Sequence, residues 1–155
     1  NKFEQTKDTL LEFILKNPTE IKAINFYLEC LLELKQFGEI EEFIDSLEKE
    51  IQEKDEIKQI EKKVNIIKNN LSGPSLEDLL NQLRNNTNDI SLIIEVSDKY
   101  FSMQDYESCF EILLKNYPAN KDTVKEKMVE LFSALGNSNE HTVNYRKKLS
   151  QIMFS

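Results

Sequence analysis

Apolar residues recur every three or four positions along almost the whole chain. In residues 21–32, for example, Ile24, Leu28 and Leu31 fall on one face of a helix with about 3.6 residues per turn. The same spacing predicts helices over residues 10–15, 37–51, 57–67, 76–83, 90–103, 106–117, 124–135 and 142–154. The pattern therefore predicts an all-α protein of about nine helices.

Short segments with helix-breaking residues separate these predicted helices. Pro18 ends the first one, because the residue before a proline avoids helical backbone angles, and Pro74, after Gly73, marks the strongest interruption. Ser75 and Ser138 are suited to cap the N-termini of the helices that follow them. Gly136 fits a left-handed cap after residues 124–135.

Aromatic residues mark equivalent helix starts and define a repeat. Phe37 follows Phe3 by 34 residues, and Tyr106 follows Phe37 by 69, about twice that period. The register continues three and seven residues further on, at Thr6, Ile40 and Cys109 and at Leu10, Ile44 and Leu113. A period of about 34 residues with two helices per unit is typical of tetratricopeptide repeats. We therefore expect a tetratricopeptide-like solenoid of helical hairpins.

The repeat register suggests how the chain is divided. We expect one helical domain over residues 1–155, with degenerate repeats over 1–71, an irregular connecting unit over 72–88, and a last repeat with a C-terminal helical pair over 89–155. The first residue is Asn1 rather than Met, and we interpret the chain as a C-terminal fragment of a longer protein. A coiled coil over residues 39–63 is an alternative, but its pattern falls short of roughly three to four heptads.

Composition and charge narrow the classes of function. The net charge of −8 disfavours nucleic-acid binding, because an acidic surface repels phosphates. The sequence has no run of about 18 apolar residues that could span a membrane. Cys30 and Cys109 lie in apolar helical patterns and are expected to be buried rather than paired.

The residue types that carry catalysis are sparse. His141 is the only histidine, and no cysteine pair with metal-ligand or redox spacing is present. We also find no glycine-rich phosphate loop and no nucleophile motif. We therefore expect no cofactor, no metal and no enzymatic activity in this region, and instead a binding or scaffolding module.

The last third of the chain resembles a known family. The run Lys127–Gly136 is followed by Tyr145-Arg146-Lys147-Lys148-Leu149, and Tyr106-Glu107 with Glu111 precedes both. Over residues 89–154 this pattern is similar to the C-terminal region of the thioredoxin-like co-chaperones called CnoX or YbbN. Over residues 1–71 only the repeat spacing agrees. Cys109, where the family often has alanine, and the short loop 117–120 depart from the family pattern.

The resemblance implies a function and partners. It implies a cytoplasmic bacterial protein whose thioredoxin-like domain lies upstream of this chain. Such a protein holds unfolding clients and passes them to a GroEL-type chaperonin, with the C-terminal helix contributing to the chaperonin contact.

Two sets of residues are candidates for binding. The candidate partner-binding residues of the last helix are Tyr145, Arg146, Lys147, Leu149, Met153 and Phe154. Tyr145, Leu149 and Ile152 are expected to pack inward, whereas Met153 and Phe154 form an apolar end that either binds a partner or folds back onto the core. The candidate concave-face residues are Lys22, Asn25, Glu29, Ser91, Ile94 and Asp98.

Alternatives to the co-chaperone remain open at this point. A non-catalytic scaffold would bind one specific peptide or subunit through the concave face. The full-length protein could be a thiol oxidoreductase through its upstream domain. The apolar edge at Phe3 and Leu10 could also produce a homodimer of the fragment.

Overall fold

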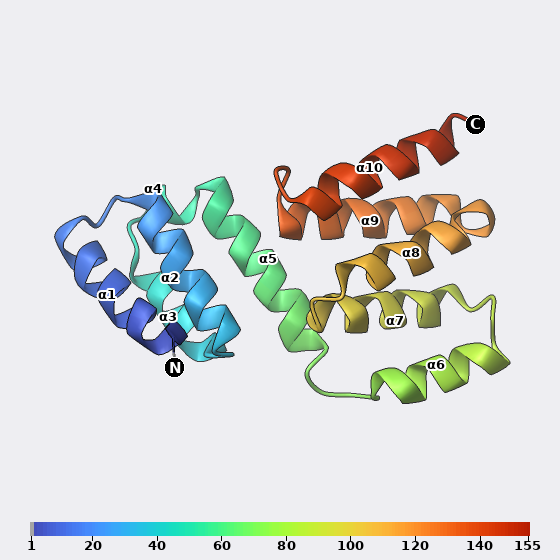
Figure 1. The fold of residues 1–155 in the computed structure, drawn as a ribbon, viewed down its shortest axis with the longest axis horizontal. Coiled ribbons are helices and arrows are strands. Elements are labelled where there is room, and N and C mark those ends of the chain that lie inside the picture. Colours follow the sequence, from blue (N-terminus) through green and yellow to red (C-terminus); the bar gives the residue numbers. More distant parts are fainter. Residues whose placement is uncertain (1) are drawn as a thin grey trace. The chain divides into compact units, whose positions relative to one another are not determined.

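The computed structural model describes residues 2–155 and contains only helices and their connections in that range (Figure 1). The α-helices are α1 (Lys2–Lys16), α2 (Ile21–Glu33), α3 (Phe37–Ser46), α4 (Lys49–Gln52), α5 (Asp55–Asn69), α6 (Leu76–Asn85), α7 (Ile90–Ser102), α8 (Tyr106–Asn116), α9 (Lys121–Leu135) and α10 (Glu140–Met153). A short 3-10 helix, Tyr117–Ala119, follows α8. The predicted all-α architecture of helical hairpins is confirmed.

The helices form two compact units, which divide within α5 after Val64. In unit 1, residues 1–64, α1 and α2 form a hairpin and α3 packs on α2. Its core is mainly aliphatic and includes Ile24, Leu28 and Leu31, all with fully buried side chains. This is the face that the 3.6-residue period of residues 21–32 predicts.

Unit 2, residues 65–155, is built from consecutive antiparallel helices (Figure 1). α7 packs against both α6 and α8, and α10 packs against α8 and α9. Its main core joins residues from α7 to α10 around Phe110, whose ring stacks on Phe132 and Tyr145 at centroid distances of 5.1 and 4.9 Å. Because these contacts link three helices, they fix α10 on the rest of the unit.

One predicted helix is wrong. Residues 37–51 form two helices, because Leu47 and Glu48 adopt extended angles with ψ of 154° and 144°. Ser46 Oγ donates a hydrogen bond to the Phe43 carbonyl oxygen at 2.6 Å. Such a local side-chain bond competes with the helical ladder. Apolar periodicity does not register this break, since Ile44 and Ile51 are buried on either side of it.

The helix caps partly follow the predictions. Ser75 caps α6 as expected and forms a reciprocal capping box with Asp78. Asn139, not Ser138, caps α10, and its Oδ1 accepts hydrogen bonds from the amides of His141 and Thr142. Gly136 has the predicted positive φ of 89°, although its ψ of 157° is extended rather than left-handed helical.

Candidate protein-binding surfaces

The last helix, α10, is anchored by one buried face. Tyr145 and Leu149 are 2% and 5% exposed and belong to the core of unit 2. The Tyr145 hydroxyl donates to Glu111 Oε1 at 3.0 Å, and Lys148 Nζ lies 2.6 Å from the same oxygen. The hydrogen bond from Lys148, followed by that from Tyr145, lowers the pKa of the Glu111 carboxyl despite its partial burial. Tyr145 and Leu149, two of the predicted site residues, therefore hold α10 in place and offer no surface to a partner.

The end of α10 is exposed and apolar. Phe154 is 85% exposed, so its side chain does not fold back onto the core. Met153 is half-buried and packs against the core instead of Ile152, which is 37% exposed. The prediction that Ile152 packs inward is therefore wrong, because the inward positions 145, 149 and 153 are spaced four apart.

The basic residues of α10 differ in their surroundings. Arg146 lies over the Phe132 ring, 5.3 Å from its centroid, and donates a hydrogen bond to Asn137 Oδ1 at 3.1 Å. Lys147 is exposed. Seven residues, about two helical turns, separate Lys147 from Phe154, so both lie on one face. The exposed surface of the predicted set is thus formed by Arg146, Lys147, Phe154 and part of Met153.

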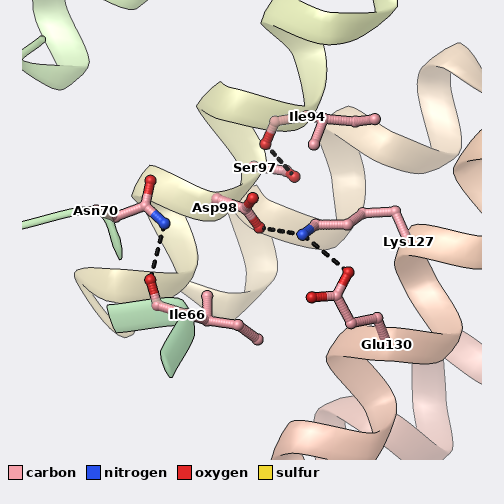
Figure 2. A network of polar contacts seen from close by, with 7 residues as sticks. All are labelled: Ile66, Asn70, Ile94, Ser97, Asp98, Lys127 and Glu130. Atoms are coloured by element: carbon pink, nitrogen blue, oxygen red, sulfur yellow. Dashed lines mark hydrogen bonds and ion pairs between the residues drawn. The ribbon is translucent and has the colours of Figure 1, made fainter. Parts of the chain in front are cut away.

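One candidate concave residue of α7, Asp98, belongs to a polar network (Figure 2). Lys127 Nζ of α9 lies 2.7 Å from Asp98 Oδ1 and 3.0 Å from Glu130 Oε2. Burial raises the pKa of the Asp98 carboxyl, although Lys127 opposes the rise. Burial lowers the pKa of Lys127, but the bonds to Asp98 and Glu130 outweigh this effect and raise it overall. Asp98 is therefore engaged within unit 2.

The other concave candidates are dispersed. Ser91 is exposed and Ile94 half-buried on α7, and the Ile94 carbonyl oxygen accepts a bond from Ser97 Oγ at 2.8 Å (Figure 2). In unit 1, Lys22 is exposed and Asn25 half-buried. Glu29 pairs with Lys63 across 3.3 Å. The three candidates of unit 1 and the three of unit 2 lie in separate compact units.

Unit 1 carries an apolar groove that the sequence indicated only at its edge. The groove has a volume of about 370 Å³ and lies between α1 and α2. Its apolar lining residues are Phe3, Leu10, Phe26 and Cys30, and its polar lining residues are Thr6, Glu29 and Glu33. The sequence analysis did not identify Phe26 as a candidate binding residue. Phe26 falls outside the apolar period of α2 and could have been recognised as an exposed aromatic residue; it is 62% exposed.

The two cysteines and the histidine are buried or half-buried. Both cysteines are buried as predicted. Burial raises the pKa of each thiol, which disfavours the reactive thiolate. Within residues 2–155 no three His, Cys, Asp or Glu side chains are grouped to hold a metal ion. His141 is half-buried, with its ring 5.5 Å from that of Tyr106. No helix in this range has both the length and the apolar composition to cross a membrane.

Comparisons with known proteins identify the repeat. No curated protein matches the sequence. A crystal structure of a domain of protein VP0806, of unknown function, from Vibrio parahaemolyticus is 23% identical with a TM-score of 0.49, over 96% of this chain and 98% of that one. A tetratricopeptide repeat model matches residues 69–154, more than half of the chain. The chain therefore belongs to the tetratricopeptide repeat family, a class of protein–protein interaction modules.

Proposed function

We propose that this chain is the protein-binding module of a thioredoxin-like co-chaperone of the bacterial cytoplasm. In this proposal it holds unfolding client proteins and docks on a GroEL-type chaperonin. The resemblance of residues 89–154 to CnoX and YbbN supports the assignment. The thioredoxin-like domain then belongs to the part of such a protein that lies outside this sequence.

The exposed end of α10 is the proposed docking element. The observation that carries the proposal is the 85% exposure of Phe154, directly after a helix that Tyr145 and Leu149 anchor to the core. Aromatic side chains are among the residues that contribute most to protein interfaces. Lys147 on the same face adds a positive charge, and the arrangement suits insertion of the helix end into an apolar groove.

The groove of unit 1 is the proposed client-binding surface. Its lining is apolar, and Phe26 and Phe3 are 62% and 43% exposed. Unfolding clients expose apolar side chains, which lose contact with water when they bind such a surface. Apolar contacts with Phe3 and Phe26 do not require one particular client sequence, which fits binding of unrelated chains.

The docking proposal is tested by capture on immobilised chaperonin. Deleting residues 145–155 would remove Tyr145 and Leu149 from the core, so a substitution of the exposed end is preferable. We expect Phe154→Ser to weaken binding by roughly 30-fold, as for an interface residue worth about 2 kcal/mol. The matched control is Val129→Ser on α9, 54% exposed, which should bind like the unchanged protein. Equal binding by Phe154→Ser and the unchanged protein would contradict docking through α10.

A second experiment separates the co-chaperone from a scaffold that binds one peptide or subunit. The protein should suppress aggregation of several unrelated unfolding proteins, and Phe26→Ser should reduce this effect while leaving the circular dichroism spectrum unchanged. Suppression of none of them by folded protein would favour the scaffold.

A further inference from the structure

A small pocket opens in unit 2 beside the N-terminus of α7, where the C-termini of α6 and α8 lie. α6 and α8 run in the same direction, because each packs antiparallel against α7 (Figure 1). Their C-terminal ends therefore lie on the two sides of the α7 N-terminus. The pocket between them has a volume of about 400 Å³, near the lower limit of ligand-binding pockets.

The pocket has an apolar floor. Leu80 and Leu83 of α6 and Ile112 of α8 line it, and all three are half-buried and pack on the cores of unit 2. Their inner atoms are fixed by the core, while their outer atoms face the pocket. A bulky apolar side chain of a ligand would remove this surface from water.

The two sides of the pocket carry one cation each. Arg84 comes from α6 and Lys115 from α8, and none of the described residues that line the pocket is acidic. Arg84 Nη1 donates to Asn81 Oδ1 at 3.0 Å, which leaves its other donors available. Lys115 is exposed and forms no ion pair with another residue in the range 2–155. By contrast, Lys127 and Lys148 of the same unit are paired with carboxylates.

These cations do more than compensate their own helix ends. Each helix C-terminus carries a partial charge of about −0.5. The two full positive charges of Arg84 and Lys115 therefore exceed the combined partial negative charge of the two C-termini. Asp89, at the end of the α6–α7 connection, accepts hydrogen bonds from the amides of Ser91 and Leu92 at 3.0 and 3.2 Å. Its charge is partly offset by the α7 N-terminus that it caps. The pocket thus keeps a positive balance in a chain of net charge −8.

We propose that this pocket binds a peptide segment of a partner protein in which a bulky apolar side chain is flanked by acidic side chains. The apolar side chain fills the floor, and the carboxylates pair with Arg84 and Lys115. Two cations on opposite sides favour two separated carboxylates over a single anionic group. Asn116 Nδ2 donates to the Ile112 carbonyl oxygen at 2.8 Å, so the Asn116 side-chain oxygen is available to a peptide N–H. This surface is independent of the end of α10.

The probe for the test is a fluorescein-labelled peptide with one leucine between two glutamates and both ends blocked. We expect saturable binding by fluorescence anisotropy at low salt. Arg84→Ala and Lys115→Ala should each weaken binding about threefold, and the double variant about tenfold. Lys121→Ala removes the same charge from an exposed lysine of unit 2 outside the pocket and should have no effect. A probe with glutamines in place of glutamates should bind about tenfold more weakly.

Three results would overturn the proposal. The first is the absence of saturable binding to the folded protein, and the second is equal affinity for the glutamine probe. The third is binding only of a peptide with a free C-terminal carboxylate, which would assign the pocket to chain ends. Phe154→Ser should bind the probe normally, so failure of this inference and failure of docking through α10 are distinguishable.

Discussion

Two residues other than glycine adopt positive φ in equivalent turns. Lys35 joins α2 to α3 with φ 57°, and Gln104 joins α7 to α8 with φ 62°. They are 69 residues apart, the same spacing as Phe37 and Tyr106. Each turn also repeats a hydrogen bond from the next amide to a carbonyl five residues earlier. The repeat is therefore visible in backbone geometry even where the side chains have diverged.

This geometry leads to a prediction at Lys35, which is exposed. In the left-handed region a residue with a Cβ has a conformational energy about 1–2 kcal/mol higher than glycine. Glycine avoids this cost, but it loses more conformational entropy on folding, which cancels part of the gain in stability. We expect Lys35→Gly to increase the free energy of unfolding by about 0.5–1 kcal/mol. Denaturant titration measures it, with Lys35→Ala as the control that should change little. A lower stability of Lys35→Gly would contradict the assigned turn.

The pair of Asp98 and Lys127 links α7 to α9, and both side chains are largely buried. Replacing one partner leaves the other charge buried and unpaired, which costs more than the pair contributes. We expect Lys127→Met to lower the free energy of unfolding by about 2 kcal/mol near pH 7, and Asp98→Asn combined with Lys127→Met to recover part of it.

The loss in Lys127→Met should depend on pH. Burial raises the pKa of the folded-state Asp98 carboxyl above its unfolded value, and without Lys127 the rise is larger. The folded variant then binds a proton more readily than the unfolded chain, so its stability increases as the pH falls through the folded-state pKa. Urea titrations at several pH values should show the gap to the unchanged protein narrowing toward acid. A constant gap would indicate that packing, not charge, causes the loss.

At the scale of elements, periodicity predicted most helices but not every helix end. α7 and α8 follow the expected ranges within a residue, because their apolar faces are long and regular. The break after Ser46 and the cap at Asn139 each involve hydrogen bonds of one polar side chain to the backbone. Ser138 and Asn139 are both good capping residues, so the sequence alone does not distinguish them.

The cap of α10 can be tested directly. Asn139 Oδ1 satisfies two amides at the start of the helix that carries the proposed docking end. We expect Asn139→Ala to lower the free energy of unfolding of unit 2 by about 1 kcal/mol, whereas Asn139→Asp should retain the cap and the stability. A thermal melt distinguishes them. If Ser138→Ala had the larger effect, the helix would begin one residue earlier than the structure has it.

At the scale of the whole molecule, charge is distributed unevenly. Residues 1–64 contain ten Lys and sixteen Asp or Glu, so unit 1 carries −6 of the net charge of −8. The apolar groove lies in this acidic unit, while the basic run of α10 and the pocket with Arg84 and Lys115 lie in unit 2. Each unit therefore presents a surface of different chemistry.

The sequence predicted these surfaces only in part. Residue type and period placed Phe154 at an apolar helix end and correctly predicted that Tyr145 and Leu149 pack inward. They did not distinguish Met153, which packs against the core, from Ile152, which is exposed. Asp98 was assigned to a binding face, whereas in the structure it pairs with Lys127. The sequence did not indicate this pair, because Lys127 lies 29 positions further along the chain.

The most direct test of the account is hydrogen–deuterium exchange on this protein with and without a GroEL-type chaperonin. If the chain docks through the end of α10, the chaperonin slows exchange in the last two turns of this helix and at Phe154, and leaves α6 unchanged. Unchanged exchange in α10 at chaperonin concentrations that bind the protein would contradict docking through this helix end.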